Sequence, residues 1–156
     1  MNFVIENHSL STMDRELISE LTNLREKVYD LEVEISRQKK IINQLKSLSN
    51  QILEPMVFTD KEGKILDVNK PLINLLGYSL FDLRRMSIRS ITPMNLHENE
   101  TKLILEELTE NKNIESRWCQ FYKINGEKIS VELKVFASFD EKGNLDGITR
   151  IIKNIL

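Results

Sequence analysis

Apolar residues recur every seven positions between Met13 and Ile52, and this register hardly slips along the stretch. A repeat with apolar residues at its first and fourth positions (a and d) is typical of a coiled coil. Such a narrow apolar seam needs a second helix to cover it. The pattern therefore predicts one long helix with a helical partner. The predicted dimer interface consists of Leu17, Leu21, Leu24, Val28, Leu31, Ile35, Ile42 and Leu45.

Charges beside the seam indicate which partner the helix takes. In a parallel pair, each residue at g faces the e residue five positions later on the other chain. Branched residues at a, with leucine dominating d, also favour two parallel strands. We therefore expect a parallel homodimer. The alternative, a solvated helix packed on its own domain, does not explain why the charges at facing positions are opposite in sign. The facing pairs, all opposite in sign, are Glu20 with Arg25, Lys27 with Glu32, and Glu34 with Lys39.

The seam broadens into an apolar stripe between Ile41 and Ile52, which we expect to cover part of the domain that follows. The heptads end at Glu54-Pro55, because proline disfavours helix in the residue before it. We therefore expect a weakly structured N-terminus over residues 1–12, a coiled coil over 13–53 and a compact domain over 54–156.

The first half of this domain reads as a hairpin followed by helices. Strands are predicted at 56–60 and 64–68, around a glycine turn. Asn69 is placed to cap a short helix that Gly77 ends, and Ser79 to cap a further helical turn. Thr92-Pro93 is expected to open another short element. A longer helix, marked by Leu103, Ile104 and Leu108, is expected to end near residues 111–113.

The second half reads as three antiparallel strands. Strands are predicted at 115–123 and 127–138. They flank Asn125-Gly126, a strong hairpin signal because both residues tolerate the positive φ of a type I′ turn. A last strand is predicted at 145–152. The order is therefore two strands, several helices and three strands, which is typical of the α+β class.

Two segments of the domain resemble a known family. VFTDKEGKILDVNKPLINLLGYSLFDL, residues 57–83, resembles the opening of a PAS sensor domain, and YKINGEKISVELKV, residues 122–135, resembles its second hairpin. The resemblance covers about residues 54 to 154. It implies a five-stranded antiparallel sheet with short helices on one face, after the coiled-coil helix. Some members of the family enclose a pocket for a cofactor or small molecule, and others have a filled core.

Strand alternation identifies the face of the sheet that would line such a pocket. Ile129, Val131, Leu133 and Val135 fall on one face, and the apolar character of this set places it inside. A small apolar ligand is therefore a possible partner. The candidate lining residues are Val57, Thr59, Cys119, Phe121, Val131, Leu133 and Val135. On the outer face, Met56, Phe58, Trp118 and Phe136 are candidates for cover by the apolar stripe of the helix.

The sequence argues against flavin and haem and leaves the cofactor unknown. The resemblance places flavin-binding amides at positions matching Phe121 and Val131, and a reactive cysteine on a helix, whereas Cys119 lies on a predicted strand. It places a haem-ligating histidine nearer Glu100 than His97. We therefore expect neither cofactor.

Composition excludes several other classes. The net charge of -2 provides no general attraction to nucleic acid or to an anionic membrane. No apolar run is long enough to cross a bilayer, and no secretion signal is present. A lone cysteine fits a reducing compartment, so we expect a cytoplasmic protein. No metal-binding or catalytic motif appears, so the chain itself is not expected to be an enzyme.

These observations together predict a signal-transduction module that couples a PAS pocket or core to a parallel dimeric coiled coil. The alternative is a ligand-free PAS adaptor that mediates dimerisation and protein-protein interaction. Asn154-Ile155 stands where many PAS domains continue into an output helix. We therefore expect the output to be a missing C-terminal effector, such as a kinase or cyclase, or the N-terminal helix acting on a partner.

Overall fold

The computed structural model describes residues 11–93, 97–111 and 113–156, and for 97–103 it describes the helix but not the side chains. The backbone forms two compact units, residues 1–45 and residues 46–156. Most of the N-terminus predicted to be weakly structured, residues 1–10, and the segment directly after Pro93 lie outside the described residues.

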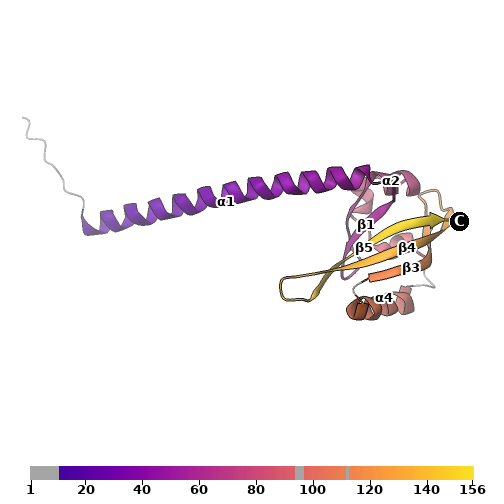
Figure 1. Ribbon diagram of the computed structural model, residues 1–156. Helices are drawn as coiled ribbons and strands as arrows, with labels where there is room; N and C mark the ends of the chain where they lie inside the picture. The colour runs from indigo at the N-terminus through magenta and orange to yellow at the C-terminus, as the bar shows by residue number, and fades with distance from the viewer. Residues whose placement is uncertain (1–10, 94–96, 112) are drawn as a thin grey trace, which may run out of the picture. The chain divides into compact units, whose positions relative to one another are not determined.

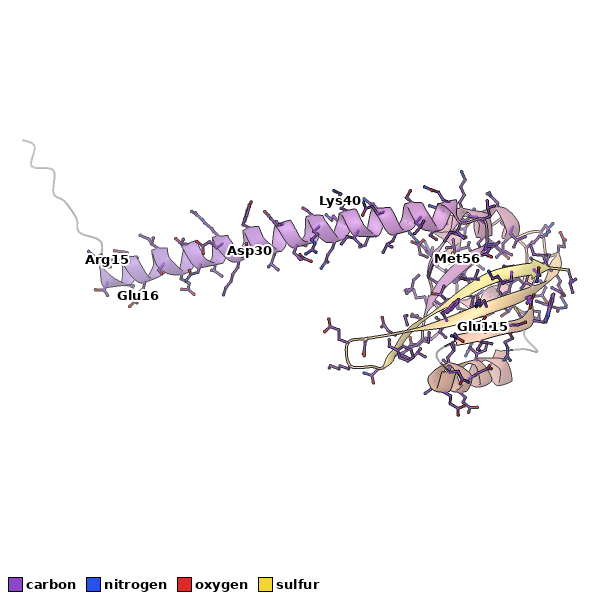
Figure 2. All side chains as sticks on the ribbon, viewed as in Figure 1. Arg15, Glu16, Asp30, Lys40, Met56 and Glu115 are labelled. Carbon is purple, nitrogen blue, oxygen red and sulfur yellow. The ribbon has the colours of Figure 1, made fainter. Side chains whose placement is uncertain are left out.

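The long predicted helix is present as α1 (Thr12–Gln51). Ser11 and Asp14 form a reciprocal capping box at its start, where the Asp14 N–H donates to Ser11 Oγ (3.2 Å) and the Ser11 N–H donates to Asp14 Oδ2 (3.0 Å). Side chains project from the helix along its whole length (Figure 2). No residue of α1 is buried, and the eight predicted interface residues are 47–63% exposed in the single chain.

The second unit is built on one five-stranded sheet in the order β2-β1-β5-β4-β3. Figure 1 labels four of these strands, β1, β5, β4 and β3, which lie in this order. All neighbouring strands are antiparallel. The predicted α+β class and the PAS arrangement of strands and helices are confirmed. The strands are β1 (Met56–Asp60), β2 (Ile65–Val68), β3 (Asn113–Tyr122), β4 (Lys128–Phe139) and β5 (Leu145–Ile155).

Short helices connect β2 to β3, and the longest of them, α4, lies beside β3 (Figure 1). The predicted caps are confirmed: the Asn69 side chain accepts from the N–H of Leu72, and the Ser79 side chain accepts from that of Asp82. Gly77 ends α2 with a φ of 82°. The helices are α2 (Lys70–Leu76), α3 (Leu80–Leu83), the 3-10 helix η1 (Ile88–Ile91) and α4 (His97–Asn111).

The core lies between the helices and one face of the sheet. Leu72 and Leu76 of α2, Leu83 of α3 and Leu108 of α4 are completely buried. The sheet contributes alternate residues of each strand, because successive side chains of a strand point to opposite faces. On β4, the four residues predicted to face inward are at most 6% exposed, so this face was assigned correctly.

The hairpin between β3 and β4 is present and its loop is residues 124–126, as the predicted strand ends imply, but its turn is not the expected type I′ turn centred on Asn125 and Gly126. The Lys123 N–H donates to the Glu127 carbonyl (2.8 Å), and the Gly126 N–H donates to the Lys123 carbonyl (2.9 Å), which makes a three-residue loop. The Ile124 N–H donates to the Leu76 carbonyl at the end of α2 (2.9 Å). This contact with α2 favours the three-residue loop.

The short element expected to open at Thr92-Pro93 falls on residues 94–96, which lie outside the described residues. The described 3-10 helix η1 ends before it, at Ile91. The apolar stripe at the end of the long helix was expected to cover part of the domain. Within the unit of residues 46–156, Leu48 of the stripe is 57% exposed and Ile52 is half-buried. Ser49 Oγ contacts Sδ of Met56, a buried residue of the outer sheet face (4.0 Å), and the extent of the cover stays a prediction.

Candidate functional site

The candidate pocket residues lie on the inner face of the sheet. Six of the seven are at most 2% exposed: Val57, Thr59, Phe121, Val131, Leu133 and Val135. Cys119 is half-buried and pairs in register with Val131, so it belongs to the same face. The structure thus brings these residues together, while their role in binding a ligand stays a prediction.

The inner face also carries Arg150, which sequence reasoning missed. Arg150 lies on β5, in register with Val57 of β1 and Val135 of β4, and is only 6% exposed. Its neighbours at alternate positions, Ile148 and Ile152, are both buried. This alternation in the last predicted strand was the signal, because it places a charged residue at an inward position.

The guanidinium of Arg150 is held by a short polar chain. Its Nη1 donates to Thr59 Oγ1 (3.0 Å), and Thr59 Oγ1 donates to the Ile148 carbonyl (3.3 Å). Burial lowers the pKa of Arg150 to about 10, while the Cys119 thiol, when ionised, acts in the opposite direction. Arg150 therefore stays charged at neutral pH inside a mainly apolar core.

A second polar centre lies where α1 meets the domain. The Asn69 side chain is 1% exposed and makes four hydrogen bonds. Its Oδ1 accepts from the N–H groups of Met56 (2.8 Å) and Leu72 (3.3 Å). Its Nδ2 donates to the carbonyls of Ser49 (3.0 Å) and Glu54 (2.9 Å). One side chain thus joins the last turn of α1, the linker, β1 and α2.

Ion pairs and a further hydrogen bond reinforce this junction. Asp67 of β2 pairs with Lys46 of α1 (3.4 Å) and with Arg84 after α3 (3.0 Å). The Lys70 N–H, at the start of α2, donates to Asn50 Oδ1 (2.8 Å). The residues in the ion pairs are partly exposed, so each pair contributes less than about 1 kcal/mol. The buried hydrogen bonds of Asn69 are the stronger part of the junction.

The described residues offer no metal centre. They include no group of three or more His, Cys, Asp or Glu side chains that could hold an ion. Phe121 and Val131, where the resemblance places flavin-binding amides, are both buried apolar residues. The side chains of His97 and Glu100 lie outside the described residues. None of the helices in the described part is long and apolar enough to span a membrane.

Comparison with known families identifies the fold. A family model described as PAS domain matches residues 53–155. A search of curated proteins gives no match. The domains detected in the chain are this PAS domain and the helix before it, and no catalytic domain is detected.

Solved structures of similar fold come from several organisms. A PAS domain from Colwellia psychrerythraea has 18% identity and a TM-score of 0.66, covering 73% of this chain and 96% of the other. The PAS domain of an HTR-like protein from Haloarcula marismortui has 17% identity and a TM-score of 0.63, covering 78% and 98%. A domain of a sensory box sensor histidine kinase/response regulator from Geobacter sulfurreducens has 19% identity and a TM-score of 0.57, covering 72% and 92%.

Proposed function

The chain belongs to the PAS domain family, and on this premise we propose that it is a signal-transduction module whose PAS core acts on a parallel dimeric coiled coil formed by α1. Sensory domains of this kind are found in sensor kinases and regulators. The observation that carries the proposal is the exposed seam of α1. Leucine, isoleucine and valine at a and d positions leave about half of their surface to solvent in the single chain.

A second helix would bury this seam. Burial of a fully exposed leucine, isoleucine or valine side chain contributes about 1.5 to 3 kcal/mol. The seam holds eight such side chains, each about half exposed in the single chain, so each contributes about half of that. The opposite charges at g and e positions contribute only about 0.3 to 0.5 kcal/mol per pair, so they select direction and register rather than supply affinity. Parallel pairing of two copies satisfies both sets of residues.

Asn69 and its partners provide the mechanical link from the core to the coiled coil. A ligand or other signal that alters the sheet would move β1, and the Asn69 side chain connects β1 to the carbonyl of Ser49 in the last turn of α1. The two helices of a dimer would then rotate or shift against each other. Both arrangements must be populated for a signal to select between them.

The test compares two substitutions on the same helix. Ile35 lies at an a position in the seam, and Val33 lies at an f position outside it. Both are branched apolar residues, and their exposure in the single chain is similar, 49% for Ile35 and 52% for Val33. Ile35→Asp places a charge in the seam, and we expect dimerisation to weaken at least about a hundredfold. Val33→Asp should leave the dimer unchanged. Sedimentation velocity of the full chain measures both.

A dimer that survives Ile35→Asp, or one that Val33→Asp weakens equally, contradicts the proposed interface. Circular dichroism of both variants controls for loss of helix. We expect Ile35→Asp to be a monomer with a folded PAS domain, and Val33→Asp to remain a dimer.

A further inference from the structure

We propose that the inner face of the sheet binds a small monocarboxylate with an apolar body, whose carboxylate pairs with the guanidinium of Arg150. This inference rests on the proposed sensory function and names the chemical class of its ligand. The observation behind it is the buried guanidinium of Arg150, whose charge the Cys119 thiol offsets when it is ionised and which no buried carboxylate of the described residues pairs.

Arg150 brings a positive charge into the core, and no carboxylate of the described residues is buried with it. Among the described residues, the buried polar side chains are those of Thr59, Asn69 and Arg150, so no Asp or Glu is buried with it. Burial of a charge is unfavourable unless the charge is paired and hydrogen-bonded. An anion from outside the chain would supply the missing charge.

The hydrogen bonds of Arg150 leave donors for such an anion. A guanidinium has five N–H donors in a planar fork, and Thr59 Oγ1 accepts from one of its nitrogens. Every fully enclosed side-chain nitrogen or oxygen of the described residues has a partner. The donors that Thr59 leaves over therefore keep some accessible surface. Two parallel N–H groups match the two oxygens of a carboxylate.

The surroundings of Arg150 define the rest of the ligand. Val57 and Val135 flank it on the neighbouring strands, and Leu133 and Phe121 line the same face. These apolar side chains favour an apolar ligand body. A second carboxylate or a phosphate would bring a further charge that no buried cation of the described residues could pair. One cation in an apolar surrounding therefore points to one carboxylate.

The test compares acids with their uncharged isosteres on the full chain. The probes are acetate, isovalerate, hexanoate, octanoate and phenylacetate, each paired with its primary amide, which has nearly the same shape but no charge. Thermal unfolding is measured at rising concentrations. We expect at least one acid to raise Tm by about 5 °C at ten times its Kd, while its amide has little effect.

Two variants assign the effect to Arg150. Arg150→Met removes the charge and should abolish the difference between acid and amide. Arg150→Lys keeps the charge but not the paired donors, and should weaken binding at least about tenfold. If no acid stabilises the wild-type chain more than its amide, or if a folded variant binds the acid as the wild type does, the proposal is overturned.

The same samples separate this inference from the proposed function. Sedimentation of the ligand-free chain reports whether it is a dimer. A monomer in that measurement contradicts the coiled-coil proposal, regardless of how the acids change Tm. A dimer that responds to none of the acids contradicts the carboxylate proposal alone.

Discussion

Asn69 shows how much a single side chain can connect. Sequence reasoning predicted it only as a helix cap, yet its amide bonds to four backbone groups from four segments. Both ends of the amide are used, with one oxygen accepting twice and one nitrogen donating twice. An asparagine is therefore needed here, because aspartate has no donor and leucine has neither group.

Asn69→Asp should separate the two functions of this amide. The carboxylate keeps the acceptor that caps α2, but it faces the carbonyls of Ser49 and Glu54 without a donor. We expect a loss of about 2 to 4 kcal/mol in the free energy of unfolding by urea at neutral pH. Faster amide hydrogen exchange in the last turn of α1 should accompany it.

Asn125→Asp is the matched control. Asn125 is exposed, and its side-chain oxygen accepts one hydrogen bond, from the N–H of Glu127. Aspartate can accept the same bond, so the change should stay within about 0.5 kcal/mol. Equal stability of the two variants would contradict the role given to Asn69.

At the scale of the element, β4 shows why the alternation of apolar and polar residues identified the buried face of the strand. Its residues alternate between buried and partly exposed positions from Ile129 to Phe136, and hydrophobicity alternates with them at most positions. A strand that is covered on one face reports that face directly in its sequence. β5 follows the same alternation but places Arg150 among the buried residues. A prediction from hydrophobicity alone would put Arg150 on the outer face.

Leu133→Asp tests the face assignment of β4. Leu133 is 2% exposed, and an unpaired carboxylate there should destabilise the domain by more than about 4 kcal/mol. Ser130→Asp, on the opposite face of the same strand, should cost less than about 1 kcal/mol. Urea unfolding followed by circular dichroism measures both. Similar losses at the two positions would mean that the faces were assigned wrongly.

At the scale of the whole molecule, the direction of the proposed helix pair would decide how a signal could pass. In a parallel dimer, two PAS domains lie at the same end of the coiled coil, and a change in either can act on both helices there. In an antiparallel dimer, the domains lie at opposite ends. The charges at g and e favour the parallel form.

Disulfide trapping distinguishes the two directions. With Cys119 replaced by alanine, Leu17→Cys at a d position should form a covalent dimer under mild oxidation, because equivalent d residues meet in a parallel pair. Asn23→Cys, at an outward c position, should not, because its partner lies too far away for a disulfide. Non-reducing electrophoresis reads the result. Equal cross-linking from both positions, or none from position 17, contradicts a parallel dimer.

Some features of the site could be predicted and others could not. The inner position of Val131 followed from alternation, and the cap at Asn69 followed from its place before Pro71. The bonds from Asn69 to Ser49 and Glu54 could not be predicted, because they join residues 15 to 20 positions away whose meeting depends on the path of the chain. The turn after Lys123 differed for the same reason, since Ile124 bonds to the end of α2.

The sequence by itself determined the long helix, the α+β class, the order of elements, the principal caps and the inner face of β4. Each of these depends on a short repeat or on contacts between residues near in the chain, so local chemistry is enough to specify it. Only the tertiary structure placed Arg150 beside Thr59 and tied Asn69 to α1. Those arrangements join distant segments, and their energies depend on burial and hydrogen bonding that exist only once the sheet has formed.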